Sequence, residues 1–205
     1  MRKLPVFSLS AALMCIAVGG AGCESVEQQR HSYLLDVERE ERISAIHNDK
    51  IAVVEEFDVS PRFRDKSLVY RTGKFRYESD YYNEFLTGPG RLISEETRKW
   101  LAGSGIFGSV LKYGEVPDPT YVVKGDVTEL YGDFSEESGG RAVMGIRFLL
   151  VDFSGEKSKI VFEKDYHCGV GLDKRSAENL IEAQNECLRR ILRRLENDLK
   201  AVVSR

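Results

Sequence analysis

The stretch that decides the fold lies at residues 176–203 and reads SAENLIEAQNECLRRILRRLENDLKAVV. Ser176 is a favourable N-cap residue, because its side-chain oxygen can accept a hydrogen bond from a free backbone N–H of the first helical turn. Apolar residues then recur at helical spacing, which predicts one amphipathic helix of about 27 residues. They are Leu180, Cys187, Leu188, Ile191, Leu192, Leu195, Leu199 and Val202. A stripe of this length must be buried against a second layer.

That second layer is expected upstream, where apolar residues alternate as they do in half-buried strands. The clearest strand is 142–152, in which every second side chain from Ala142 to Leu150 is apolar. Further strands are expected at 33–37, 50–60, 67–70, 74–77, 107–113, 121–131 and 160–168. Thr72-Gly73 predicts a hairpin turn between the third and fourth of these.

A second helix is expected between Pro89 and Gly103, since Ile93, Thr97 and Trp100 recur at helical spacing. Two helices and several hairpin-connected strands predict an α+β domain. In this prediction a mostly antiparallel sheet of about six strands carries both amphipathic helices on one face.

Composition limits the classes of protein to consider. The chain has 205 residues, of which 42% are hydrophobic and 31% charged, and this describes one globular domain with a short extra segment. A formal net charge of −3 with this apolar content excludes a disordered chain. Because 30 basic residues face 33 acidic ones, we expect no nucleic-acid partner.

The N-terminus reads as a bacterial lipoprotein signal. A basic start, Met1-Arg2-Lys3, precedes an apolar run at 4–18, small residues at 19–22 and then Cys23. The run is too short for a spanning helix, and its end resembles a lipobox, which makes Cys23 the lipid attachment site. The expected organisation is a signal peptide at 1–22, the lipidated cysteine and a tether at 23–32, and one domain at 33–205. The alternative is plain secretion with cleavage nearby.

Two cysteines remain in the predicted mature domain. Cys168 and Cys187 either form a disulfide, as thiol pairs often do outside the cytoplasm, or act as two separate buried hydrophobes. A bond would close a loop of about 20 residues and stabilise the fold by roughly 3 kcal/mol on the chain-entropy model.

Aromatic residues crowd one short stretch of the chain. Tyr70, Tyr77, Tyr81, Tyr82 and Phe85 either form the rim of a sheet and the edge of the core or present a contact surface to a protein partner.

Motifs of catalysis are missing from the sequence. His31, His47 and His167 lie far apart, without the spacing of a zinc site. There is no GxSxG elbow and no P-loop. We therefore expect no catalytic residues, no metal and no cofactor, and a protein that is not an enzyme.

Several segments together resemble the ABC-type transport auxiliary lipoproteins, the family that includes the paraquat-inducible-type lipoprotein. They are FDVSP at 57–61, LVYR at 68–71, RYESDYYNEF at 76–85, RKWLAGSGIFGSVL at 98–111 and YVVKGDVTELYGDF at 121–134. The resemblance covers about residues 33–200, nearly all of the predicted mature chain.

The resemblance implies a lipoprotein of the outer membrane that faces the periplasm and docks a lipid conduit. The implied partners are a mammalian-cell-entry (MCE) domain protein with its ABC permease and ATPase, as well as phospholipid, and some members form a homo-oligomeric ring. The alternative is an envelope structural lipoprotein that assists outer-membrane assembly, similar to the lipopolysaccharide-export lipoprotein. Lipid identity and the direction of transport stay open.

Overall fold

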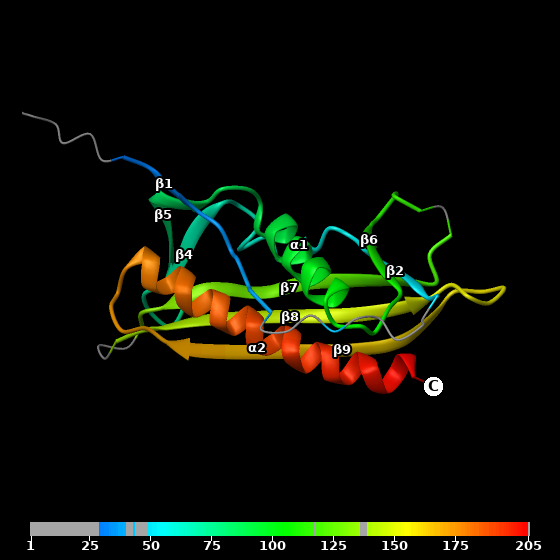
Figure 1. Ribbon diagram of the computed structural model, residues 1–205. Coiled ribbons are helices and arrows are strands. Elements are labelled where there is room, and N and C mark those ends of the chain that lie inside the picture. Colours follow the sequence, from blue (N-terminus) through cyan, green and yellow to red (C-terminus); the bar gives the residue numbers. More distant parts are fainter. Residues whose placement is uncertain (1–28, 40–42, 44–48, 117, 136–138, 205) are drawn as a thin grey trace, which may run out of the picture.

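The computed structural model describes residues 29–39, 43, 49–116, 118–135 and 139–204, which form one sheet and two helices (Figure 1). The helices are α1 (Pro89–Ala102) and α2 (Ala177–Val203). The strands are β1 (His31–Tyr33), β2 (Ile51–Val54), β3 (Asp58–Val59), β4 (Ser67–Arg71), β5 (Tyr77–Phe85), β6 (Ser109–Lys112), β7 (Tyr121–Asp133), β8 (Arg141–Asp152) and β9 (Lys159–Gly171).

The predicted sheet is wrong in strand number and in direction. The described residues form a nine-stranded mixed sheet in place of a mostly antiparallel sheet of about six strands. Five strand pairings are parallel, namely β1–β5, β2–β6, β2–β7, β3–β7 and β4–β7. Three are antiparallel, namely β4–β5, β7–β8 and β8–β9. The fold is therefore mostly sheet, with an antiparallel meander beside a parallel half.

Strand β7 organises this arrangement. One edge of β7 pairs with β8 along its whole length. The other edge pairs in turn with β2 at 121–123, β3 at 126–127 and β4 at 132–133, each time in parallel. Parallel partners need long crossover connections, so these pairings join segments that are distant in the sequence.

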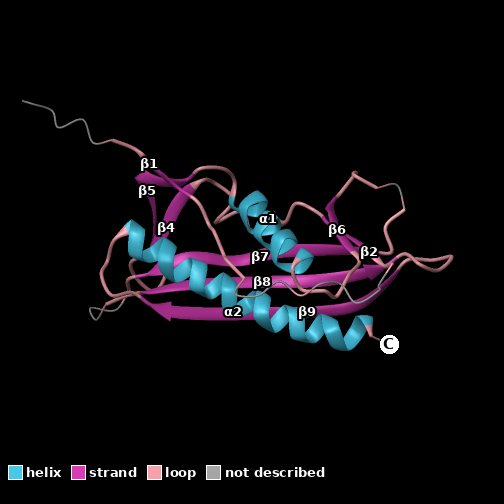
Figure 2. Ribbon diagram, in the orientation of Figure 1, coloured by secondary structure: helices cyan, strands magenta, loops and turns pink. Residues whose placement is uncertain are grey.

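Helix α2 buries its apolar stripe against β8 and β9, and both helices lie on the same face of the sheet (Figure 2). The helix begins directly after Ser176, whose Oγ accepts a hydrogen bond from the backbone N of Asn179 at 3.2 Å. Leu188 and Ile191 of α2 are fully buried, as are the inward residues of β8, among them Phe148. The apolar side chains of the helix, which recur about every 3.6 residues, thus pack against those of the strand, which recur every second residue.

Residues 34–37 form a loop between the two helices, so the strand expected at 33–37 is wrong for this part of the chain. Leu35 and Val37 are buried, while the residues between and after them are exposed. The backbone N of Val37 donates to Glu96 Oε2 of α1 at 2.9 Å, and the backbone N of Asp36 donates to Asn185 Oδ1 of α2 at 2.9 Å. Side chains of the two helices therefore bind the backbone of this loop in place of a neighbouring strand. The alternation of buried and exposed residues at 34–38 explains why the sequence resembles a strand.

The carboxylate of Glu196 joins this loop to both helices. It pairs with the Arg39 guanidinium and accepts hydrogen bonds from Trp100 Nε1 at 2.8 Å and from Lys200 Nζ at 2.6 Å. Burial raises the pKa of Glu196, but these donors outweigh burial and hold it below its ordinary value. A buried carboxylate with this many donors is stable only in its charged form.

We expect Glu196→Gln to lower the free energy of unfolding by about 3–5 kcal/mol at neutral pH, because the neutral amide loses the charge pairing of the buried carboxylate with the guanidinium of Arg39. The stabilisation by the ionised carboxylate is present above the pKa of the unfolded chain and is lost as the pH falls through the lowered folded pKa. The variant should therefore lose part of the acid sensitivity of the wild type in urea unfolding series.

Glu186→Gln on the same helix is the matched control. Glu186 pairs with Arg189 and Arg190 at the surface, where removal of one partner should cost less than about 1 kcal/mol. Equal losses in the two variants would contradict the role given to Glu196.

Close packing across the sheet gives a second prediction. A Cβ added at Gly125 of β7 would lie 2.6 Å from the ring of Phe57, which itself packs edge-to-face on Phe148 at 5.5 Å between centroids. Gly125→Ala should lower the unfolding free energy by about 1–3 kcal/mol, the usual cost of an overpacked core. In Gly171→Ala the new Cβ meets nothing within 4 Å, so an equal loss there in urea unfolding would refute this account.

Candidate binding surfaces

The structure separates the five aromatic residues expected to form one partner-binding surface. Tyr70 of β4 stacks on Phe134 with ring centroids 5.2 Å apart, and its hydroxyl donates to Asp80 Oδ2 at 2.9 Å. Burial, together with the hydrogen bond to Asp80, raises the pKa of the Tyr70 phenol. Phe85 of β5 is only 2% exposed and belongs to the core. These two residues therefore hold the sheet together and offer little to a partner.

Tyr77 lies at the start of β5, where it packs on Tyr131 and Phe63 with ring centroids 5.6 and 6.4 Å away. Arg71 beside this cluster pairs with Asp133. Tyr77 is half-exposed, so it closes one end of the open sheet face and keeps one edge in solvent.

Tyr81 and Tyr82 of β5 contact each other, with Tyr81 exposed and Tyr82 half-buried. Their rings meet edge-to-face at 5.1 Å, and the Arg30 guanidinium lies 4.5 Å from the Tyr81 ring, which is 69% exposed. Asp80 Oδ1 accepts hydrogen bonds from the backbone N of Tyr82 at 2.8 Å and of Asn83 at 3.0 Å. Tyr81 therefore lies exposed beside Arg30 of the N-terminal segment, while Tyr82 is half-buried.

A larger apolar feature lies on the sheet face opposite the helices. The register pairs Leu111 with Val53, Val53 with Val122, Val122 with Val151 and Val151 with Ile160. Residues directly opposite one another in a sheet point to the same side. One apolar row therefore crosses β6, β2, β7, β8 and β9 on this open face.

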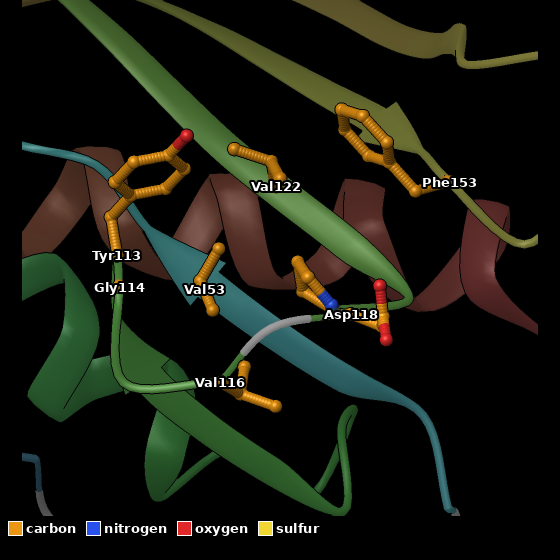
Figure 3. A pocket seen from close by; sticks show the side chains of 8 residues that line it. Val53, Tyr113, Gly114, Val116, Asp118, Val122 and Phe153 are labelled. Atoms are coloured by element: carbon orange, nitrogen blue, oxygen red, sulfur yellow. The ribbon is translucent and has the colours of Figure 1, made fainter.

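The middle of this row is the floor of a groove, and α2 runs behind the strands on the far side (Figure 3). The cavity holds about 440 Å³, within the rough range of 300–1,000 Å³ for small-molecule sites. Val53 and Val122 are buried in the floor, whereas Tyr113 is 67% and Phe153 46% exposed at the rim. The remaining lining residues are Gly114, Val116, Asp118 and Pro119.

Polar side-chain pairs lie along the rest of the open face. Lys124 Nζ lies 3.1 Å from Glu55, Arg147 Nε lies 3.3 Å from Asp165, and His167 Nδ1 lies 2.9 Å from Glu129. An apolar groove within a polar surface can take an apolar chain or side chain out of water. Its lining supplies contact area and shape, and among the described lining residues Asp118 is the only ionisable side chain besides the Tyr113 phenol.

Sequence reasoning missed this groove, although a signal for it exists. Residues 51–54 (IAVV) and 121–123 (YVV) are continuous apolar runs and do not alternate. Such runs indicate strands that are covered on both faces. The helices cover only one face of the sheet. The apolar side chains of these runs that lie on the other face therefore indicate a further contact surface.

The two cysteines lie next to each other across the interface of α2 and β9, and both are free thiols in this structure. The Cys187 Sγ is buried and lies 4.0 Å from the carbonyl oxygen of Ala142, and Cys168 is half-buried. Burial, with the hydrogen bond to Cys168, raises the pKa of the Cys187 thiol. The disulfide stays a prediction, and Cys23 lies outside the described residues.

Metal-binding clusters and membrane-spanning helices are both absent from the described part of the chain. There, no group of three or more His, Cys, Asp or Glu side chains is arranged to hold a metal ion. Over the same residues, neither helix combines the length and apolarity that a membrane span needs. His31 lies on β1 and His167 on β9, and His47 lies outside the described ranges.

Comparisons with known proteins extend the description of the fold. No family model and no curated protein matches the chain. It is similar to the crystal structure of an uncharacterized protein, with a TM-score of 0.67 and 13% identity over 83% of this chain and 99% of that one. It is also similar to a Xanthomonas campestris protein described as DUF330, with a TM-score of 0.68 and 11% identity over 80% of this chain and 92% of that one. Both likenesses show the fold alone.

A more distant neighbour is a lipoprotein of Neisseria meningitidis, with a TM-score of 0.35 and 12% identity over 70% of this chain and 99% of that one. So low a TM-score carries no argument. The lipoprotein prediction rests on the N-terminal sequence.

The thiol pair gives a prediction for chemical modification. In protein kept reduced, iodoacetamide at mildly alkaline pH should alkylate Cys168 and leave Cys187 unmodified, because the thiolate is the nucleophile and burial suppresses it. Peptide mass spectrometry locates the label, and the same treatment in denaturant should label both. Equal rates for the two native thiols would contradict the burial of Cys187. In protein isolated without reductant, alkylation of neither would show the disulfide.

Proposed function

We propose that this protein is a lipid-anchored, non-catalytic protein of the bacterial cell envelope, which docks the conduit of an ABC/MCE-type lipid transport system at the outer membrane and faces the periplasm. The N-terminal pattern that ends in Cys23 supports the anchor. The segments shared with ABC-type transport auxiliary lipoproteins support the transport role.

The observation that carries the proposal is the position of the groove relative to β1, the first described strand after the proposed anchor. The described chain begins at Gln29, directly before β1. Strand β1 pairs with β5, and β5 pairs with β4. Strand β4 in turn pairs with β7 at Gly132. The groove floor includes Val122 of the same strand. Gly132 and Val122 are 132 − 122 = 10 residues apart along β7, which corresponds to roughly 33 Å.

An anchored domain built this way presents the groove away from the lipid attachment. Figure 1 shows β1 at the β4–β5 end of the sheet and the loop between β6 and β7, which forms the groove rim, at the other end. A docking component needs an anchor, a rigid scaffold and an accessible contact surface. The apolar row and its exposed aromatic rim provide such a surface.

The test is affinity purification of the membrane-extracted protein, followed by mass spectrometry of the co-purifying proteins and phospholipids. The wild type should recover an MCE-domain protein with its permease. The double variant Tyr113→Ser/Phe153→Ser should lose that recovery by at least tenfold, because both rim rings are exposed and aromatic anchors dominate binding energy at interfaces. Unchanged circular dichroism and urea unfolding would show that the variant is folded.

Tyr81→Ser is the matched control, an equally exposed aromatic side chain at the anchor end of the sheet. It should retain the partners. Their loss in Tyr81→Ser with retention in the rim variant would instead place docking on the tyrosine pair. Recovery of outer-membrane assembly factors alone would refute the transport role and support the structural alternative.

A further inference from the structure

The tip of the β4–β5 hairpin carries the most exposed large apolar side chain of the described residues. Phe75 is 86% exposed. Lys74 precedes it and Arg76 follows it, and the Lys74 ammonium lies 5.2 Å from the centroid of the Phe75 ring. An aromatic ring between two cations is a combination that suits the interface of a bilayer, where the ring enters the acyl boundary and the cations meet lipid phosphates.

The turn holds this ring in an outward position. The backbone N of Thr72 donates to the carbonyl oxygen of Arg76 at 3.0 Å and closes the loop. Arg76 Nε donates to Thr72 Oγ1 at 2.8 Å, and the Thr72 hydroxyl donates to Glu78 Oε1 at 2.7 Å. The tip is thus braced on the polar side chains at its base, and Phe75 extends beyond them.

The length of chain before the described residues places this tip near the membrane. From Cys23 to Gln29 there are 29 − 23 = 6 residues, which span at most about 20 Å. His31 pairs with Asn83 of β5. Strand β5 begins at Tyr77, next to the hairpin tip, and Tyr77 is 83 − 77 = 6 residues from Asn83 along the strand, again about 20 Å. The anchor therefore confines the domain with its β4–β5 end close to the bilayer.

We infer that the hairpin tip is a second membrane contact, in which Phe75 inserts into the interface of an anionic phospholipid bilayer while Lys74 contacts its headgroups. Arg76 holds the turn through Thr72 and its ion pair with Glu78 at 3.4 Å. The inference rests on the lipid anchor of the proposed function. It selects a lipid surface over a protein, because a lone ring between cations matches an anionic interface, whereas protein hot spots cluster around a packed centre.

Tryptophan fluorescence tests the insertion in the full lipoprotein. The only tryptophan of the chain, Trp100, is buried at 4% exposure and gives a constant background. Phe75→Trp and the matched control Phe153→Trp, at the groove end, are reconstituted through their N-terminal lipid into vesicles of phosphatidylcholine and phosphatidylglycerol, with and without brominated acyl chains. Emission from Phe75→Trp should be quenched at least twofold more than emission from Phe153→Trp.

The charge requirement is tested in the same vesicles. Adding Lys74→Glu to Phe75→Trp, or leaving out phosphatidylglycerol, should reduce the quenching, because surface attraction by anionic lipid scales with each basic residue near it. Equal quenching at positions 75 and 153, or quenching indifferent to phosphatidylglycerol and to Lys74, would overturn the inference.

The outcomes also separate this inference from the proposed function. If the anchored protein floats with the vesicles and position 75 stays unquenched, the inference fails while the docking role is untouched. If mass spectrometry finds no acyl chain and the protein does not float, the anchor is refuted, and the membrane contact with it.

Discussion

The hydrogen-bonded edges of β7 are the constraint on which the rest of the structure depends. One edge is fully used by β8, so β2, β3 and β4 must share the other, each over two or three residues. Pairing at both edges satisfies backbone groups of β7 that would be costly to bury unpaired. This sharing sets the order of the sheet and places the N-terminal strands at one end and β2 with β6 at the other.

Two faces of the same sheet are used in different ways as a result. The face under α1 and α2 is a closed core in which Tyr166, Phe148 and their neighbours are sealed from water. The other face is polar in the middle, with an aromatic cluster around Tyr131 at one end and the groove around Val122 at the other. The contact features of the molecule therefore lie at the ends of β7, and the middle of the sheet only sets their distance.

Local pattern predicted part of this fold, and the reason for each success or failure is physical. The period of α2, its cap at Ser176 and the alternation in β8 are local properties of the chain. The parallel pairings are not, because they join segments that only the finished core brings together. The loop at 34–37 alternates without strand partners, and strand geometry sends Tyr70 and Tyr81 to different surroundings. The apolar runs at 51–54 and 121–123 indicate a second contact face, but the strand register that makes this face a groove is not a local property of the chain.

The way the chain enters the domain has a mechanical consequence. Tension on the N-terminus would load the three-residue β1 along its own axis, so its ladder to β5 would be sheared as a unit and not unzipped bond by bond. Behind β1, the Tyr33 hydroxyl donates to Glu178 at 2.8 Å, Val37 is held by Glu96 and Arg39 by Glu196. A pulling force from the membrane would thus act on the two helices through these hydrogen bonds and the ion pair in succession. The groove floor would not bear this force.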